Sequence, residues 1–420
     1  MKSSLHHIDI PEASHALFLG VAEKYSKNVA QSISKKDTTK HEYSLAVAGD
    51  EAYQKKVTQA VAPLRGARHV VLIGIGGSSL GTEAVYEAVA MHTNAALHVL
   101  DAIEPESLAQ VERCIASVQS PEELAIIVAS KSGNTTETVT NAAAFIEIAE
   151  KKFGKDTRSR IVFVGTEGSE FLENGKKEKV ICVTIPESIG GRYSVFTAVG
   201  IVPLTILGLD VESFREGAEK AMEKKSRDMS IENAIALAWL AEEGTHTINF
   251  FTFNERLRSL GMWYRQLLAE SIGKNMTTDG TTFPHQLLPT VSTSVDLHSM
   301  AQLYLGGYKG MVTHFIYGDI ESDHHKFADH WILSHMKQLE GHTPLEIKNI
   351  IRESVLKAYN DQRLPYLYTK LPKITAFEIG YFMASEMFTV MVLGALLHVD
   401  VFNQPNVEDY KRHIREALAK

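Results

Sequence analysis

A strand, a polar turn and a helix follow one another directly in the stretch LAIIVASKSGNTTE, residues 124–137. The apolar run 124–128 is rich in Ile and Val, which is typical of a strand buried on both faces. Asn134 and Glu137 have the spacing of a capping box, so we expect the following helix to begin there. A chain that repeats this unit is restricted to a parallel sheet with helices on its faces.

The turn of this unit has the composition of an anion-binding site. Its side chains include three hydroxyls and one ammonium group, those of Ser130, Lys131, Ser132 and Thr135. The start of a helix adds free N–H groups and a positive dipole end. For a hydroxyl cluster alone, an ordinary capped helix would be the simpler interpretation. The lysine and a second turn of the same kind favour a dianion such as a phosphate monoester.

That second turn follows the strand candidate 69–73 and has the sequence GIGGSSLG, residues 74–81. Its glycines, Gly77 among them, allow the backbone to approach a ligand closely, and Ser78 adds a hydroxyl. Two such turns predict a phosphorylated small molecule as the ligand. A dinucleotide is the competing ligand, although Ser79 replaces the third glycine of G-x-G-x-x-G and no G-x-x-x-x-G-K-[ST] occurs.

Composition and charge argue against several other classes of protein. The net charge is −8, and no basic stripe suggests nucleic acid or an anionic membrane. The apolar run 387–397 is too short to cross a bilayer and indicates a buried helix. The N-terminus lacks the apolar segment of a secretory signal. With only Cys114 and Cys182 as cysteines, we expect free thiols and a cytoplasmic protein.

Strand and helix patterns alternate along most of the chain. This predicts an α/β fold with two doubly wound parallel-sheet domains, each in three αβα layers. We place an N-terminal arm at 1–45, the first domain at 46–212, the second domain at 213–400 and a C-terminal tail helix at 401–420. The strand candidates of the first domain are 70–73, 97–100, 124–128, 161–165 and 180–185. Ligands of such sheets bind at the carboxyl ends of strands, where both turns fall.

The second block alternates less regularly. Its helix candidates are 231–243, 254–272 and 329–340, and its strand candidates are 246–253 and 310–317. Beyond Asp361 we expect a loop that contains Pro365 and Pro372, then the long buried helix. A terminal helix is predicted at 407–419.

Gln266 and Glu270 are the candidate catalytic pair. They lie four residues apart on the predicted helix 254–272, away from its apolar stripe, and therefore share a face. The sequence Ile272-Gly273 ends that helix, which puts Glu270 in the last turn, where the helix dipole would raise the pKa of its carboxyl group towards that of a general base. A solvated helix face is the alternative interpretation.

Other polar residues are more ambiguous. Arg192 follows two glycines, so its guanidinium could reach an anion, or it could be a surface arginine. His298 and Lys411 would ordinarily be a structural histidine and a solvated lysine. Four histidines share no helical face and lack a carboxylate partner pattern, so we expect no metal site at His324, His325, His330 and His335.

Taken together, these stretches resemble the phosphoglucose isomerase family of glycolysis. The shared segments occur in the family's order: GIGGSSLG, SKSGNTTE, IGGRYSVFTAVG, the Gln266/Glu270 helix with ESIGK, DLHS around His298, and FNQPNVEDYK. They extend from Gly74 to Lys411, and the GGRYS and terminal FNQ segments are highly specific. The chain is shorter than the animal members and is similar to compact bacterial ones.

The resemblance implies two domains of the sugar-isomerase type and the interconversion of glucose 6-phosphate and fructose 6-phosphate, through a cis-enediol(ate) and without metal or organic cofactor. By position, the residues that hold the phosphate and nearby oxygens would be Gly77, Ser78, Ser130, Lys131, Ser132 and Thr135. Glu270 would move a proton between C2 and C1, with Gln266 beside it. Arg192 would stabilise the intermediate.

The resemblance also assigns the ring-opening groups. His298 and Lys411 would open the sugar ring, with Gln404 near the ligand. In the family the histidine at the position of His298 comes from the partner subunit, which implies a homodimer. Two positions depart from the family pattern. Asn403 replaces an aspartate, and Asn406 replaces a glycine whose positive φ an asparagine could also adopt.

Three alternatives stay open at this point. An isomerase of wider scope would also accept mannose 6-phosphate. A non-catalytic sugar-phosphate-binding protein would need the two turns, but not Glu270, Arg192 and Lys411 together. The only support for a nicotinamide-dependent dehydrogenase would be the Gly74 turn, with Asp101 as a ribose-binding acid.

Overall fold

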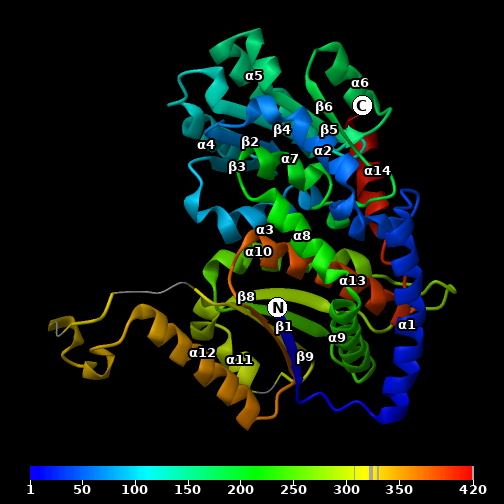
Figure 1. Cartoon of the computed structure of the whole chain (residues 1–420), viewed down its shortest axis with the longest axis vertical. Helices are drawn as coiled ribbons and strands as arrows, with labels where there is room; N and C mark the ends of the chain where they lie inside the picture. The colour runs from blue at the N-terminus through cyan, green and yellow to red at the C-terminus, as the bar shows by residue number, and fades with distance from the viewer. Residues whose placement is uncertain (307, 321–324, 329–330, 419–420) are drawn as a thin grey trace.

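The computed structural model describes residues 1–306, 308–320, 325–328 and 331–418. Two five-stranded sheets lie one above the other in Figure 1, with helices packed on them. In β2 (His69–Ile73), Val70 and Leu72 face the central hydrophobic core, whereas Val71 and Ile73 face an outer cluster. Alternating burial on two faces is what a covered parallel sheet requires. The predicted α/β class is confirmed.

The first sheet consists of five parallel strands in the order β3-β2-β4-β5-β6. Besides β2 they are β3 (Ala96–Leu100), β4 (Leu124–Ala129), β5 (Ile161–Thr166) and β6 (Ile181–Ile185). All five predicted strands are therefore confirmed. The chain reverses its direction of winding between β2 and β4, and the crevice at such a switch point is the usual ligand position. The turns after β2 and β4 both lie there.

One detail of the β4 turn differs from the prediction. The helix α5 (Thr136–Phe153) has Thr135 as its N-cap and no side-chain cap, so the predicted capping box of Asn134 and Glu137 is wrong. Instead the turn is closed from within, because the Gly133 N–H donates to Ser130 Oγ at 3.1 Å and Gly133 has a φ of 74°. The other helices of this half are α2 (Glu51–Ala60), α3 (Leu80–Val89), α4 (Pro105–Ile115), α6 (Glu170–Lys177) and α7 (Ala198–Ile206).

The second sheet has the order β1-β10-β9-β7-β8. Four of its strands are parallel: β7 (Thr247–Thr252), β8 (Leu288–Thr293), β9 (Met311–Gly318) and β10 (Tyr366–Leu371). The N-terminal strand β1 (Lys2–His6) pairs antiparallel with β10 and forms one edge. The switch point of this sheet lies between β7 and β9. The strand candidates 246–253 and 310–317 are confirmed as β7 and β9.

Three strands of this sheet were not predicted, and one helix was placed wrongly. β10 lies between Pro365 and Pro372, which had indicated a loop, and β8 contains Pro289, which an edge strand tolerates. Within 331–340 the structure has only the short 3-10 turns Trp331–Leu333 and Lys337–Leu339. The helix of this region is α12 (Pro344–Asp361), which begins at a capping box formed by Thr343 and Glu346.

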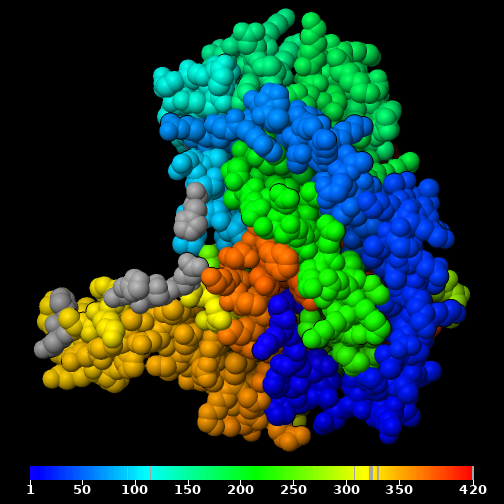
Figure 2. All heavy atoms as spheres, viewed as in Figure 1, coloured from blue at the N-terminus to red at the C-terminus, as the bar shows by residue number. Residues whose placement is uncertain are grey.

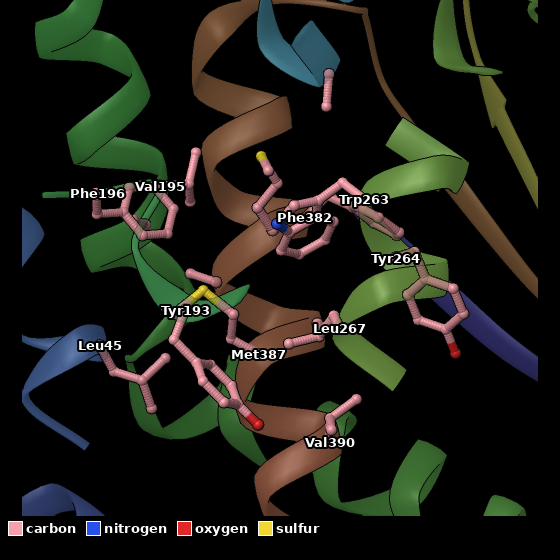
Figure 3. Packing of buried hydrophobic residues seen from close by; sticks show 14 of the residues in the cluster. Leu45, Tyr193, Val195, Phe196, Trp263, Tyr264, Leu267, Phe382, Met387 and Val390 are labelled. Atoms are coloured by element: carbon pink, nitrogen blue, oxygen red, sulfur yellow. The ribbon is translucent and has the colours of Figure 1, made fainter. Parts of the chain in front are cut away.

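The helix α13 (Ala376–Leu396) forms the centre of the molecule. By length and composition it could cross a membrane, but 94% of its most apolar window is buried inside the protein, as in a core helix. Figure 3 shows its Phe382 and Met387 between Trp263 and Leu267 on one side and Tyr193 and Val195 on the other. One continuous core therefore joins the two sheets. Around it pack α1 (Glu12–Lys35), α8 (Val211–Ala221), α9 (Lys224–Glu242) and α10 (Arg258–Ile272).

Two short segments complete the chain. α11 (Ala301–Gly306) precedes β9, and the terminal helix α14 (Glu408–Leu418) follows a 3-10 turn at Pro405–Val407. In Figure 1 α14 is the red helix drawn at the level of the first sheet. Cys182 is a free thiol. The side chain of Cys114 lies outside the described part of the chain.

Candidate active site

Glu270 lies in the last turn of α10, as predicted. Its carboxylate has a donor at each oxygen. Gln266, one turn earlier, donates from Nε2 to Oε1 at 2.9 Å, and Gln404 donates from Nε2 to Oε2. The side chain of Glu270 is one-third exposed, so the carboxylate is held in one orientation and still faces solvent.

Arg192 forms the cationic side of this site. Its guanidinium is buried, and Nη1 lies 3.2 Å from Glu270 Oε2. Nε donates to Ser271 Oγ at 2.9 Å, while Nη2 donates to the carbonyls of Val401 and Asn403. Ser271 also contacts the hydroxyl of Tyr193 at 2.9 Å. A buried guanidinium needs such a full set of acceptors, and these fix its position against Glu270.

Lys274 is a residue of this site that the sequence analysis did not single out. It is 5% exposed, and its Nζ donates to the Glu270 carbonyl at 2.7 Å and to the Asn403 carbonyl at 2.6 Å. Burial, and then Arg192, lower the pKa of its ammonium group to about 8, against the opposing effect of Asp400 and Glu270. Lys274 and Arg192 together tie the segment that carries Gln404 to the end of α10.

Asn403, whose side chain departs from the family pattern, contributes its backbone carbonyl to this contact. A change of its side chain therefore leaves the contact in place. Asn406 lies in the 3-10 turn Pro405–Val407 and is not among the residues with positive φ. The expectation that Asn406 keeps a glycine-like φ is wrong.

The glycine turn after β2 lies directly against this carboxylate site. A Cβ at Gly77 would lie 2.2 Å from the carbonyl carbon of Gly191, and a Cβ at Gly76 would lie 2.8 Å from Gln266 Nε2. Only glycine permits this approach, because real Cβ atoms do not come so close to other atoms. Ser194 Oγ donates to the Gly77 carbonyl at 3.2 Å. Ser78, half-buried, follows in the same turn.

The hydroxyl turn after β4 is the neighbour of the glycine turn, since β2 and β4 are adjacent strands. Ser130 Oγ and Thr135 Oγ1 are 3.2 Å apart, and Ser132 Oγ accepts from the Asn134 N–H at 3.3 Å. Lys131 donates to the Glu187 carbonyl at 2.7 Å, and partial burial lowers the pKa of its ammonium group. The two turns thus place hydroxyls, a cation and glycine backbone at one switch point.

His298 and Lys411 do not contact Glu270 within the single chain. His298 is the last residue of the 3-10 turn Ser294–His298, which follows β8. Its side chain is exposed and lines a cavity of about 490 Å³, together with Leu297, Gln302 and Leu305. Lys411 lies in α14, where its Nζ contacts Glu408 Oε1 at 3.1 Å. The structure therefore brings together Glu270, Gln266, Arg192 and Gln404, and leaves these two apart from them.

No group of three or more His, Cys, Asp or Glu side chains in a metal-binding arrangement occurs among the described residues. His325 and His335 belong to these residues. His324 and His330 lie outside them.

The comparisons with known proteins agree on one family. The phosphoglucose isomerase family model matches residues 59–419. The glucose-6-phosphate isomerases of Clostridium tetani and of Fusobacterium nucleatum subsp. nucleatum are 32% and 29% identical over 312 and 309 residues. Each match covers 71% of this chain, and 67% and 66% of the respective relative. The chain thus spans about two thirds of the length of the curated relatives that it matches.

The fold has close counterparts among solved structures. A hypothetical protein from Thermus thermophilus superposes with a TM-score of 0.86 at 24% identity, over 100% of both chains. A glucose-6-phosphate isomerase from Chlamydia trachomatis superposes with a TM-score of 0.79 at 17% identity, over 99% of this chain and 88% of that one. The chain therefore shares the fold of these two proteins. From the match of the family model to most of its length, the chain belongs to the phosphoglucose isomerase family of enzymes.

Proposed function

We propose that the chain interconverts glucose 6-phosphate and fructose 6-phosphate, a step of glycolysis and gluconeogenesis. The observation that carries this proposal is the Glu270 carboxylate, held by two amides and paired with a buried arginine, beside two turns suited to a phosphate. An aldose–ketose isomerase needs these three parts: a base at C1 and C2, a cation for the intermediate, and an anchor for the phosphate.

The proton transfer uses Glu270. In the open-chain sugar, the carboxylate takes the proton from C2, and the electron pair of that bond forms the C1–C2 double bond of a cis-enediolate. The electron pair of the C1 carbonyl moves onto O1 in this step. A proton then passes from O2 to O1, and the same carboxyl group returns its proton to C1 while the electron pair on O2 forms the carbonyl at C2. Gln266 and Gln404 keep the carboxylate oriented for both steps. A positioned base of this kind contributes about 10² to 10⁴ in rate.

Arg192 stabilises the enediolate. Because its guanidinium is fixed by Ser271, Val401 and Asn403, it needs no rearrangement when negative charge develops on the sugar oxygen. The phosphate is held by the two turns, through Gly77 and Ser78 of the first and through Ser130, Lys131, Ser132 and Thr135 of the second. The sheet switch point supports this assignment, since both turns lie at it.

Ring opening is assigned to His298 and Lys411, and this requires a homodimer in which His298 completes the partner's site. Two features support the assignment. Apolar side chains near His298 are exposed, with Val295 69% and Leu303 48% accessible. In Figure 2 the yellow and orange segments project sideways from the rest of the molecule. Trp331 is also exposed. Exposed apolar surface of this kind marks a protein interface.

The remaining assignments follow from the same proposal. The enzyme acts without metal or organic cofactor, binds no nucleic acid or membrane, and works in the cytoplasm. The first domain is placed at 46–212 and the second at 213–400, with the arm 1–45 and the tail 401–420 attached. A dual activity on mannose 6-phosphate is the second candidate function, because glucose 6-phosphate and mannose 6-phosphate give the same C1–C2 enediolate. Turnover with both epimers would distinguish them.

The direct test is Glu270→Gln. The matched control is Glu255→Gln, an exposed residue in the 3-10 turn just before the same helix. We expect turnover of fructose 6-phosphate to fall by about 10² to 10⁴ in the first variant and to stay at the wild-type level in the second. Binding of fructose 6-phosphate should persist in both. Binding without turnover in the wild type as well would instead indicate a non-catalytic sugar-phosphate-binding protein.

A further inference from the structure

Three cationic side chains gather at the opposite end of α10 from Glu270. They are Arg256, Lys348 and Arg352, which we call the basic cluster. Arg256 lies in a 3-10 turn (Glu255–Leu257) just after β7, and the other two lie one turn apart on α12. Arg256 and Glu270 are 14 positions apart, so the cluster and the catalytic carboxylate are on the order of 20 Å apart along the helix axis.

The aromatic ring of Tyr317 in β9 packs against two side chains of the basic cluster. The Arg352 guanidinium carbon lies 4.0 Å from the centre of its ring, and Lys348 Nζ lies 5.8 Å from it. Asn349 Oδ1 accepts from both the Tyr317 hydroxyl at 2.9 Å and Arg352 Nη1 at 3.1 Å. Arg352 is therefore fixed, and its side chain is only 13% exposed. The partly exposed Arg256 and Lys348 are the groups that a ligand can reach.

The positive charge of the basic cluster is only partly neutralised. Arg352 is paired with Glu353 at 2.7 Å. The other nearby carboxylates have cations of their own, because Glu255 is paired with Arg258 and Asp319 with Lys370. Within the described part of the chain, the hydrogen-bond acceptor of Arg256 is Met91 Sδ, at 3.0 Å. Among the described residues no carboxylate pairs with Arg256 or Lys348, so a net charge of two is left without a counter-ion.

The position of the cluster is that of a ligand site. It lies at the carboxyl ends of β7 and β9, which are the two strands at the switch point of the second sheet. Asn254 joins these strand ends, because its amide donates to the Gly318 carbonyl and accepts from the Gly318 N–H. Ligands of open α/β sheets bind at such points. In the first sheet the corresponding point carries the two proposed phosphate turns, whereas the proposed isomerase reaction leaves this second point unused.

We propose that Arg256, Lys348 and Arg352 form a second anion-binding site, separate from the catalytic centre, whose ligand is a phosphate group, either free or carried by a small phosphorylated metabolite. A dianion matches the uncompensated charge of two. Lys348 and Arg256 would contact the anion directly. The more deeply buried Arg352 would contribute its positive charge to the electrostatic potential at the site.

The site has a pH dependence that follows from its geometry. Burial, and then Arg256 and Arg352, lower the pKa of the Lys348 ammonium group to about 8. The groups that face Lys348 are these two arginines and the Tyr317 ring, with Glu353 engaged by Arg352. A bound anion favours the protonated amine, so affinity falls as the pH rises through about 8.

The test is a calorimetric titration of the whole protein with inorganic phosphate, with and without saturating fructose 6-phosphate. We expect two phosphates per chain, of which fructose 6-phosphate displaces only one. Lys348→Met and Arg256→Met should each weaken the site that is not displaced by about tenfold, the effect of losing one charged hydrogen bond. Isomerase turnover without added phosphate should stay at the wild-type level in both variants.

Arg258→Met is the matched control, because Arg258 is 66% exposed and is the first residue of α10, two positions after Arg256. It should leave both phosphates bound. Repeating the titration with glycerol 3-phosphate distinguishes a phosphorylated metabolite, which would bind more tightly than phosphate, from phosphate itself.

Three outcomes would overturn the proposal. The first is a single phosphate per chain that fructose 6-phosphate displaces completely. The second is an equal loss of binding in Arg258→Met. The third is loss of phosphate from the basic cluster as the protein concentration rises and sedimentation shows that the chains associate. The cluster would then be a contact with a second copy of the chain. None of these bears on turnover in Glu270→Gln, so the two proposals fail separately.

Discussion

At the scale of single residues, the carboxylate of Glu270 depends on groups that are far apart in the sequence. Gln266 is its helix neighbour, but Arg192 precedes it by 78 residues and Gln404 follows it by 134. Lys274 links the segment that carries Gln404 to the end of α10, because its ammonium group donates to the carbonyls of both Glu270 and Asn403. We therefore treat Lys274 as a residue that positions Gln404 without touching the substrate.

Lys274 should give the activity an alkaline limb near pH 8. As its ammonium group loses a proton, its two hydrogen bonds to carbonyls weaken, because charged donors form bonds about twice as strong as neutral ones. Lys274→Met removes this titration and should lower kcat by about tenfold. The measurement is kcat against pH for both proteins. The same limb near pH 8 in the methionine variant would contradict this role.

The sequence could predict part of this site but not the rest. The four-residue spacing of Gln266 and Glu270 places them together on any helix, and Gly190-Gly191 before Arg192 indicates a close approach. Lys274 offers no such signal, because a lysine after a helix stop is ordinarily exposed. Its burial arises from Asn403, 129 residues later in the chain.

At the scale of elements, the contact between α8 and α13 sets how closely these two central helices pack. A Cβ at Gly217 of α8 would lie 1.9 Å from the carbonyl oxygen of Phe377, and a Cβ at Gly380 of α13 would lie 1.9 Å from that of Phe214. The helices therefore touch backbone to backbone. Trp263 of α10 packs in the same core, so the position of the catalytic helix depends on this contact.

Gly380→Ala should destabilise the protein by about 1–3 kcal/mol, because the added methyl group must push the two helices apart. Gly20→Ala is the control, since Gly20 lies in α1 with no atom within 4 Å of an added Cβ. That change should raise the stability by about 0.5–1 kcal/mol through helix propensity. Denaturant unfolding measures both. Equal stability of the two variants would show that the helices can separate freely.

The strands that could be predicted from the sequence differ from those that could not in their burial and in the prolines within or beside them. The strands of the first sheet are continuous Val- and Ile-rich runs, because both of their faces are covered. β8 lies at an edge and carries Pro289, and β10 has a proline on each side, so both lack that signal. Within 331–340 the predicted helix does not form, whereas α12 begins after Thr343, whose hydroxyl accepts from the Glu346 N–H.

At the scale of the whole molecule, the proposed reaction centre needs more than one chain. A single chain supplies the base, the arginine and the phosphate turns, whereas its own His298 lies at a separate cavity after β8. A dimer that inserts His298 into the partner's site would bring the missing group to Glu270. From the sequence, only the resemblance to the family implies this, because residue patterns within one chain do not reveal a contact between chains.

Mixing two inactive variants tests the shared site. In a heterodimer of Glu270→Gln and His298→Ala, one site combines both defects and the other is intact. After the subunits have been dissociated and reassociated in equal amounts, we expect about a quarter of the wild-type activity to return. Each variant treated alone is the control. Activity that stays at the level of the separate variants would show that His298 serves its own chain or none.

The central claim, proton transfer through Glu270, is tested most directly by isotope incorporation. Fructose 6-phosphate is converted in deuterated water with a metal chelator present, and the deuterium at C2 of glucose 6-phosphate is measured for the wild type and for Glu270→Gln. We predict deuterium at C2 in the wild-type product, and a rate of incorporation lower by about 10² to 10⁴ in the variant. Wild-type product without deuterium, or incorporation that the variant leaves unchanged, would contradict the mechanism.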